Sequence, residues 1–163
     1  MAASYADRLK AAPSNPAPQK ALPNLLLVGG PSGSGKTTIA NWHKQYGFNP
    51  AAADDFFYKN GVYKFDKTKL SDAHKGCFSR TKTLLLRGYW MVVHNTFITL
   101  KELEPYLELE DIATITIYSV KSRYTSDKEI PQYVLDRQIS NYEPHPREKG
   151  VVLDQETNKL VFS

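Results

Sequence analysis

The 163-residue sequence contains a single cysteine, Cys77, and has no long hydrophobic run. One cysteine cannot form an intramolecular disulfide, which favours a reducing, intracellular setting, and without cysteine partners it does not indicate a metal site. The N-terminus has no apolar run of the signal-peptide kind, and no stretch approaches the roughly 20 apolar residues that a membrane span needs. We therefore expect a cytoplasmic protein with no membrane partner.

Acidic and basic residues nearly balance, with a formal net charge of +4, but they are unevenly distributed. Basic residues dominate between residues 66 and 87, and acidic residues dominate between residues 101 and 111. A basic patch is compatible with a phosphate-rich partner such as nucleic acid. An ordinary solvated helix face explains each patch equally well.

Composition divides the chain into two parts. Residues 1–23 are rich in alanine and proline and offer too little apolar surface to offset the entropy of ordering, so we expect a mobile tail, with a short helix over 5–12 as an alternative. Residues 24–163 have the length and the apolar content of one globular domain.

From residue 24 onward, short apolar runs alternate with longer amphipathic segments. The apolar runs predict buried strands at 24–29, 50–53, 89–95 and 113–120. The amphipathic segments predict helices at 36–47, 67–88, 100–109 and 131–142, and the chain ends in a predicted β-hairpin at 151–162. The long helix carries an apolar stripe of Leu70, Ala73, Cys77, Thr81 and Leu84. This alternation predicts a three-layer α/β fold with a mostly parallel sheet.

The segment GPSGSGKT at residues 30–37 fits the pattern GxxxxGK[ST]. Its glycines let backbone N–H groups form a nest for phosphate oxygens, and the start of a helix adds partial positive charge. In this layout Lys36 reaches the β- and γ-phosphates, and the Thr37 hydroxyl coordinates Mg²⁺. The segment follows a buried strand and opens a helix, which favours a nucleoside-triphosphate site over a mere glycine-rich turn. The expected nucleotide-binding residues are Gly30, Ser32, Gly33, Ser34, Gly35, Lys36, Thr37 and Thr38.

Two adjacent aspartates, Asp54 and Asp55, are the only acids that follow a plausible strand on the phosphate side of the sheet. Many P-loop proteins place an aspartate at the end of another strand, but here that position holds His94. A kinase must orient and help deprotonate an acceptor hydroxyl, and one carboxylate near Mg²⁺ can do so. The second carboxylate could fix the first, cap the next turn or support a water on the metal, and either could contact the metal. The alternative is that the pair only marks a turn or a helix N-cap.

Several motifs in this order resemble the small P-loop kinases related to polynucleotide 5′-hydroxyl kinase. The motifs are GGPSGSGKTTIA, ADDFF, GVYKFD, AH, a strand ending in NTF, and EIPQYVLDRQISNYEP. Relatives of that family include the kinase-like domain of cyclic-nucleotide phosphodiesterase and phage enzymes that phosphorylate hydroxymethylated bases in DNA. The resemblance covers roughly residues 25–144, and DDFF followed by NT is its more specific part.

The resemblance implies roles for particular residues. The general base of polynucleotide kinases is the first acid of such a pair, which corresponds to Asp54. The family usually has DNTN at the third strand, whereas this chain has HNTF, which increases its dependence on Asp54 and Asp55. The family's arginine-rich lid corresponds to a segment with Arg123, which would stabilise the transferring phosphoryl group, unless Arg123 is a plain surface residue. Arg137 matches an arginine in the following helix, although a helix-face salt bridge explains it as well.

Three further residues are candidates for contacts with the acceptor. His74 is either a buried, hydrogen-bonded histidine or an acceptor contact, and His94 is a candidate phosphate or acceptor contact at a strand end. Tyr58 and the aromatic residues around it could stack on a base, or could close the core beneath a loop.

These inferences predict a kinase that uses ATP and Mg²⁺ to phosphorylate a hydroxyl on nucleic acid, either a 5′-end or a hydroxymethylated base. The expected partners are a nucleoside triphosphate and a DNA or RNA acceptor, in the cytoplasm (the host cytoplasm if a phage encodes the chain). The alternatives are a nucleoside or small-molecule kinase and a non-catalytic nucleotide-binding module. The intact Lys36, Thr37 and Asp54 count against the non-catalytic module.

Overall fold

The computed structural model describes residues 21–122 and 130–163. Most of the predicted N-terminal tail, the alternative helix at 5–12, and the predicted lid with Arg123 therefore lie outside the described residues. In the part of the chain that is described, no helix has the length and apolar character needed to cross a membrane.

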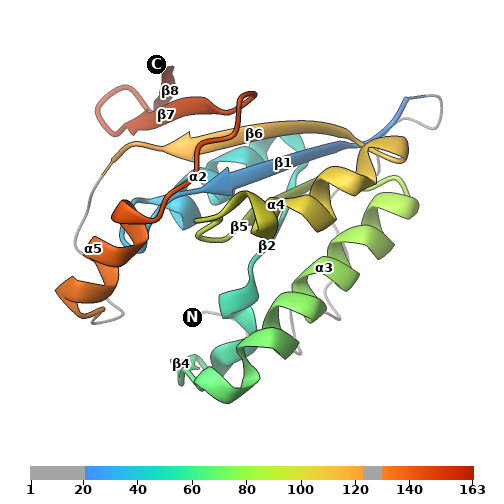
Figure 1. The fold of residues 1–163 in the computed structure, drawn as a ribbon. Helices are drawn as coiled ribbons and strands as arrows, with labels where there is room; N and C mark the ends of the chain where they lie inside the picture. Colours follow the sequence, from blue (N-terminus) through green and yellow to red (C-terminus); the bar gives the residue numbers. More distant parts are fainter. Residues whose placement is uncertain (1–20, 123–129) are drawn as a thin grey trace.

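A six-stranded sheet forms the centre of the molecule (Figure 1). Its strand order is β2-β5-β1-β6-β7-β8, and all neighbouring strands are parallel except the antiparallel pair of β7 and β8. The strands are β1 (Asn24–Gly29), β2 (Asn49–Ala51), β5 (Met91–His94), β6 (Thr114–Val120), β7 (Lys149–Asp154) and β8 (Lys159–Phe162). The predicted α/β fold, its mostly parallel sheet and its C-terminal hairpin are confirmed.

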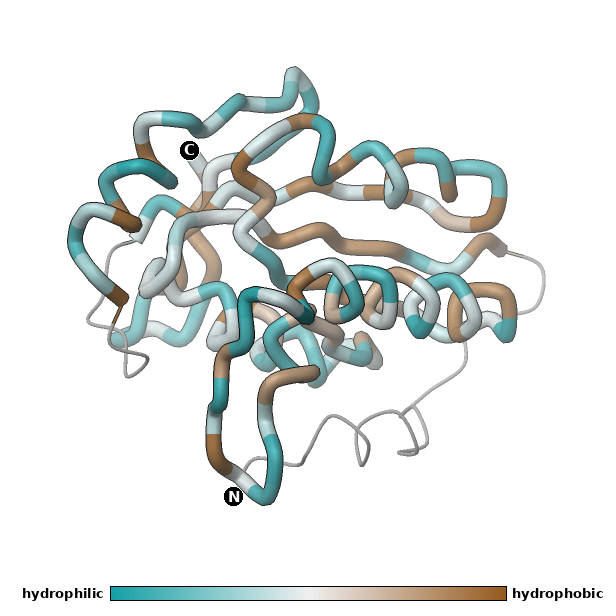
Figure 2. The backbone as a smooth tube through the Cα atoms, turned by 60° about the horizontal axis from the view of Figure 1, so that its bottom comes forward, coloured by the Kyte–Doolittle hydropathy of each residue, from teal (hydrophilic) through white to brown (hydrophobic). Residues whose placement is uncertain are grey.

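Helices pack on both faces of the sheet and give three layers. The helices are α2 (Lys36–Trp42), α3 (Leu70–Leu86), α4 (Leu100–Leu107) and α5 (Gln132–Ser140). Alternate residues of β1 serve the two faces: Leu25 and Leu27 belong to the core cluster under α3 and α4, and Leu26 packs with α2. Figure 2 shows hydrophobic residues along the strands in the middle of the molecule. Figure 1 places α5 beyond the end of the sheet to which β1 and β6 point.

The long helix α3 is shorter than predicted but keeps most of its apolar stripe. Residues 67–69 form a 3-10 turn, η3 (Lys67–Lys69), and the chain leaves the helix through Gly88, whose φ is 90°. Four of the five predicted stripe residues are buried, namely Ala73, Cys77, Thr81 and Leu84. The prediction for Leu70 is wrong, because this first helical residue follows the exposed η3 turn and is 37% exposed.

Other predicted elements end in 3-10 turns. The predicted helix 36–47 is α2 followed by η1 (His43–Tyr46), and the predicted helix 100–109 is α4 followed by η4 (Glu108–Asp111). The predicted strand 50–53 stops at Ala51, because the chain coils into η2 (Ala53–Phe57). A small hairpin of β3 (Tyr58–Lys59) and β4 (Val62–Tyr63) follows, closed by an Asn-Gly turn with positive φ at both residues, as hairpin turns prefer.

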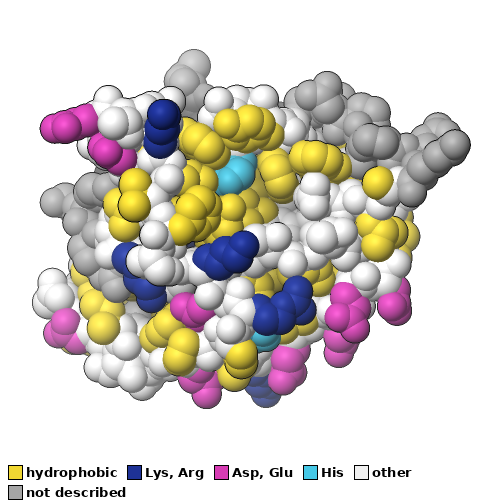
Figure 3. Space-filling model, turned by 90° about the horizontal axis from the view of Figure 1, so that it is seen from above, with side chains coloured by type: hydrophobic (Ala, Val, Ile, Leu, Met, Phe, Trp, Pro, Cys, Tyr) yellow, Lys and Arg dark blue, Asp and Glu magenta, His cyan; other side chains and the backbone are white. Residues whose placement is uncertain are grey.

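One face of the sheet is only partly covered. Figure 3 shows hydrophobic side chains gathered around a histidine on the side of the molecule that lies uppermost in Figure 1. Val161 and Phe162 of β8 are 53% and 51% exposed, and Phe162 lies edge-on against Tyr118 of β6 at 5.4 Å between ring centres. The Trp42 indole N–H donates to the Asn158 carbonyl at 3.0 Å and joins α2 to the hairpin turn.

Candidate active site

The segment between β1 and α2 has the backbone of a phosphate-binding loop. Gly33 and Gly35 have φ of 78° and 94°, a left-handed conformation that favours glycine. The Gly30 N–H donates to the Thr96 carbonyl at 3.1 Å, which fixes the loop to the chain leaving β5. The loop therefore lies at the sheet edge where β1 and β5 end side by side, with Val28 in register with His94.

The polar side chains of the loop have these contacts and exposures. The Lys36 ammonium donates to the Pro31 carbonyl at 3.0 Å and so bridges the two ends of the loop. Thr37 and Thr38, in the first turn of α2, are exposed, and the Thr37 hydroxyl lies 3.4 Å from Nδ1 of His94. Ser34 is fully buried, and its hydroxyl has no partner among the described residues.

The two aspartates lie in η2 at the same edge of the sheet. Ala51 of β2 pairs in register with Val93 of β5, so the strand that leads to the aspartates ends beside the strand that leads to His94. Asp55 is 6% exposed, and its Oδ2 accepts from the Ala52 N–H at 3.2 Å, so it caps the turn, one of the roles left open by the sequence. Asp54 is half-buried and is the carboxylate that the turn leaves toward solvent.

A tyrosine from the small hairpin contacts Asp54. The Tyr63 hydroxyl donates to Asp54 Oδ1 at 3.2 Å. Burial raises the pKa of Tyr63 above its ordinary value, and the charge and hydrogen bond of Asp54 raise this pKa further. Tyr58 packs against the Tyr63 ring at 5.1 Å between ring centres, so it supports this contact. Nothing in the local sequence pattern linked Tyr63 to Asp54, because the contact depends on the hairpin turn.

Asn95 anchors the start of η2 from the neighbouring strand. It is 7% exposed, its Oδ1 accepts from the Ala53 N–H at 2.8 Å, and its Nδ2 lies 3.9 Å from the Cys77 sulfur. Cys77 is a core residue as predicted, and burial raises the pKa of its thiol to about 11. Asn95 was not among the predicted site residues, although its place directly after a buried strand was the available signal.

His74 lines a pocket between α3 and α4. The pocket has a volume of about 350 Å³ and is lined by His74, Lys75, Phe78, Phe97, Glu102, Pro105 and Tyr106. Phe97 of this pocket follows Thr96, whose carbonyl accepts from Gly30, and the Tyr106 hydroxyl donates to the Cys77 sulfur at 3.4 Å. The pocket is thus linked to the loop by Phe97, and to the start of η2 through Cys77 and Asn95.

Helix α5 reaches the loop through a glutamine, which sequence reasoning did not select. Gln138 Oε1 accepts from the Ser32 N–H at 2.9 Å, and its Nε2 lies 3.4 Å from the Ser32 hydroxyl. The predicted Arg137 is its neighbour but is exposed, and its guanidinium lies 5.7 Å from the centre of the Tyr133 ring. Within the described residues Arg137 forms no ion pair, so the helix-face salt bridge that the sequence left open is not observed there.

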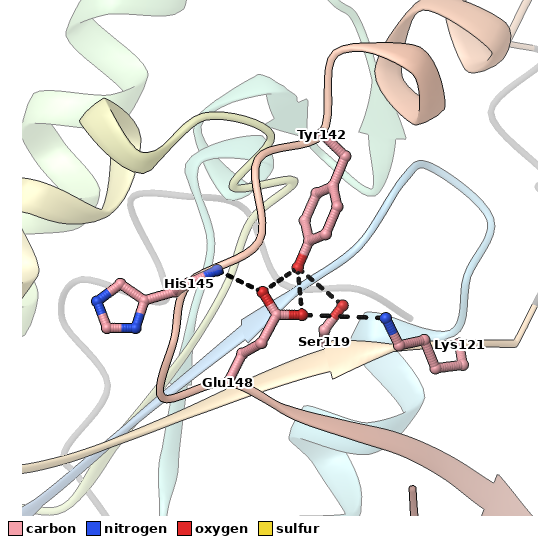
Figure 4. A network of polar contacts seen from close by, with 5 residues as sticks. All are labelled: Ser119, Lys121, Tyr142, His145 and Glu148. Carbon is pink, nitrogen blue, oxygen red and sulfur yellow. Dashed lines mark hydrogen bonds and ion pairs between the residues drawn. The ribbon is translucent and has the colours of Figure 1, made fainter.

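A second polar network fixes the end of β6 (Figure 4). The Tyr142 hydroxyl donates to the Glu148 carboxylate at 2.6 Å and lies 3.0 Å from the Ser119 hydroxyl. The His145 N–H donates to the same carboxylate at 2.6 Å, and Lys121 lies 3.9 Å from it. Burial and the Glu148 hydrogen bond raise the pKa of Tyr142 to about 12, so this hydroxyl stays protonated as a donor. The network holds the segment before β7 against β6.

Within residues 21–122 and 130–163, no group of three or more His, Cys, Asp or Glu side chains is arranged to hold a metal ion. The arrangement that does occur is a phosphate nest with a lysine, an exposed threonine hydroxyl and a half-buried carboxylate at one sheet edge. These groups can hold a polyphosphate and accept a proton from a neighbouring hydroxyl.

The chain resembles a curated protein in sequence and several solved structures in fold. No protein-family model matches the chain. A segment of 90 residues, 52% of the chain, is 33% identical to NEDD4-binding protein 2 from Homo sapiens, and it spans 5% of that protein. The chain thus corresponds to only a small part of the curated relative that it matches.

Several of the solved structures that resemble the chain are kinases. In a structure of the Pnkp1/Rnl/Hen1 RNA repair complex, the match has a TM-score of 0.61 and 20% identity over 77% of this chain and 49% of that chain. A sugar kinase from Janibacter sp. HTCC2649 matches with a TM-score of 0.57 and 19% identity over 81% of this chain and 85% of that chain. The fold of this chain is therefore that of the P-loop kinases.

Proposed function

We propose that the chain is a phosphotransferase that moves the γ-phosphate of ATP to a hydroxyl on nucleic acid, either a 5′-hydroxyl or a hydroxymethylated base. The observation that carries the proposal is the placement of Asp54 at the sheet edge that also bears the phosphate-binding loop. The kinase fold of the structural neighbours supports phosphoryl transfer, and the RNA repair complex among them supports a nucleic-acid acceptor.

The loop would hold the triphosphate. The N–H groups of the turn at Gly33 and Gly35 cradle phosphate oxygens, and Lys36 exchanges its contact with the Pro31 carbonyl for the β- and γ-phosphates. The exposed Thr37 hydroxyl would be the protein's ligand for Mg²⁺, which neutralises charge on the phosphates. Arg123 is the proposed source of positive charge over the transferring group.

Asp54 would be the general base. The acceptor oxygen forms a bond to the γ-phosphorus while the bond to the β–γ bridging oxygen breaks, so ADP leaves and the acceptor proton moves to the Asp54 carboxylate. The Tyr63 hydroxyl, which stays protonated, donates to Oδ1 of Asp54 and orients the carboxylate. Asp55 and Asn95 hold the turn in which Asp54 lies.

The pocket between α3 and α4 is the proposed site for the nucleotide that carries the acceptor hydroxyl. Its walls are mostly apolar and aromatic, as suits the binding of a nucleobase. Its volume is within the range of about 300–1,000 Å³ that is typical of ligand pockets. Lys75 at its rim offers charge to a backbone phosphate, and His74 offers a hydrogen bond.

A panel of acceptors tests the proposal. Radiolabelled γ-phosphate should move to 5′-hydroxyl DNA or RNA, or to duplex that contains hydroxymethylated bases, in preference to free nucleosides and sugars. Lys75→Glu should weaken oligonucleotide binding and lower the salt slope of binding by about one, because one phosphate contact is lost. The matched change Lys82→Glu, at an exposed position of the same helix outside the pocket, should have a smaller effect.

A small-molecule or nucleoside kinase is the second candidate, favoured by the likeness to a sugar kinase. In that case the same panel would show transfer to free nucleosides or sugars and none to oligonucleotides. ATP binding without transfer to any acceptor would instead favour a non-catalytic nucleotide-binding module.

A further inference from the structure

The end of β5 carries a histidine against the threonine that opens α2. His94 is 7% exposed, and its Nδ1 lies 3.4 Å from the Thr37 hydroxyl oxygen. Parallel pairing of β5 with β1 fixes this contact, because His94 is in register with Val28 at the end of the strand that leads into the loop. The histidine is thus held beside the hydroxyl by the sheet rather than by a flexible loop.

A hydroxyl that gives a lone pair to a cation must point its hydrogen at an acceptor on the other side. In many P-loop proteins the side chain at the end of this neighbouring strand is an aspartate of the metal site. An imidazole nitrogen accepts a hydrogen bond only when it carries no proton. His94 can therefore serve as the acceptor only as a neutral ring with its proton on Nε2.

We infer that neutral His94 accepts the Thr37 hydroxyl hydrogen through Nδ1 and so turns the oxygen of Thr37 toward Mg²⁺. His94 is then a positioning residue for the metal ligand and has no contact with the reacting atoms. The inference rests on the proposed function, because it requires Mg–ATP to bind at the loop.

A histidine in place of an aspartate changes the affinity of the site for Mg²⁺. A neutral imidazole supplies the geometry of an acceptor but adds no negative charge, so it attracts Mg²⁺ less than an aspartate would at the same place. Removal of a hydrogen-bond partner behind a metal ligand typically costs about 10–100-fold in metal affinity. The concentration of Mg²⁺ needed for nucleotide binding is therefore the quantity that His94 controls.

Calorimetric titration of the full chain with ATP at a series of Mg²⁺ concentrations tests the inference. His94→Leu, which has no acceptor, should raise the Mg²⁺ concentration for half-maximal binding by about 10–100-fold, and should leave binding of metal-free ATP unchanged. His94→Asn, whose side-chain oxygen can accept the same hydrogen, should remain close to the wild type. His94→Asp, a charged acceptor, should lower the required Mg²⁺ concentration.

A double mutant provides the control for specificity. In a Thr37→Ala background, His94→Leu should cause no further change in the Mg²⁺ requirement, because the hydroxyl that it orients is gone. If His94→Leu leaves the Mg²⁺ requirement of the otherwise wild-type chain unchanged, or if His94→Asn is as impaired as a stably folded His94→Leu, the inference is wrong while the proposed function stands. A wild-type chain that binds no Mg–ATP would overturn both.

Discussion

Asn95→Ala is expected to destabilise the fold and to displace the proposed base at the same time. The Asn95 Oδ1 is the acceptor for the Ala53 N–H at 2.8 Å, and both residues are buried. Alanine at position 95 leaves this N–H without its partner and without water, a loss that costs about 1–3 kcal/mol. The second contact, from Nδ2 to the Cys77 sulfur at 3.9 Å, is long and contributes little.

The expected change in thermal stability follows from this cost. A loss of about 2 kcal/mol corresponds to a decrease in Tm of about 4–8 °C for a chain of this length. Differential scanning calorimetry measures the decrease. Asn41→Ala is the matched control, because Asn41 is exposed on α2 and the same change there should stay within about 0.5 kcal/mol.

The kinetic effect separates a structural role from a role in positioning. Because η2 begins at Ala53, the loss of its anchor should move Asp54 and lower kcat below the temperature at which the variant unfolds, while the KM for ATP changes little. A Tm within 1 °C of the wild type would refute the energetic reasoning. A normal kcat in a destabilised variant would refute the claim that Asn95 positions Asp54.

Tyr63→Phe should lower kcat by about 10–100-fold and leave the KM for ATP unchanged in steady-state assays, because a hydrogen bond to a charged group contributes about 1.5–3 kcal/mol. An unchanged kcat would mean that this hydroxyl does not orient Asp54. Gln138→Ala should weaken the docking of α5 on Ser32, which hydrogen exchange of α5 amides would report as faster exchange. Burial lowers the pKa of His43 below its ordinary 6.5, so the folded state favours the neutral ring. The resulting stabilisation is fully present above pH 6.5 and is lost as the pH falls through the lowered pKa. His43→Phe should therefore flatten the dependence of Tm on pH below 6.5, and an equally steep dependence would exclude His43 as its source.

The sequence predicted the features that depend on local pattern. The loop at residues 30–37, the strand before it and the helix after it were predictable, because glycine spacing and apolar periodicity act over a few residues. Burial of Cys77 followed from its place on the stripe of α3, whereas Leu70 on the same stripe is exposed because it lies at the end of the helix. Periodicity gives the face of a helix but not how far the neighbouring layer extends.

Glycine spacing and apolar periodicity could not predict the contacts that shape the site. Asn95 meets Ala53 because β5 lies between β2 and β1, and that strand order is not written in any local segment. Gln138 meets Ser32 across 106 residues, so its neighbour Arg137 was as reasonable a choice from the sequence. The role of Asp55 as a cap was one of several alternatives, and only the backbone geometry of η2 selects it.

The most direct test of the central claim compares Asp54→Asn with the wild type in single-turnover transfer of labelled γ-phosphate from ATP to a 5′-hydroxyl oligonucleotide. We expect Asp54→Asn to bind ATP with wild-type affinity and to lose transfer, because the amide cannot take the acceptor proton. Asp72→Asn, an exposed aspartate on α3, should retain transfer. Full turnover by Asp54→Asn would contradict the assignment of Asp54 as the base on which the proposed function depends.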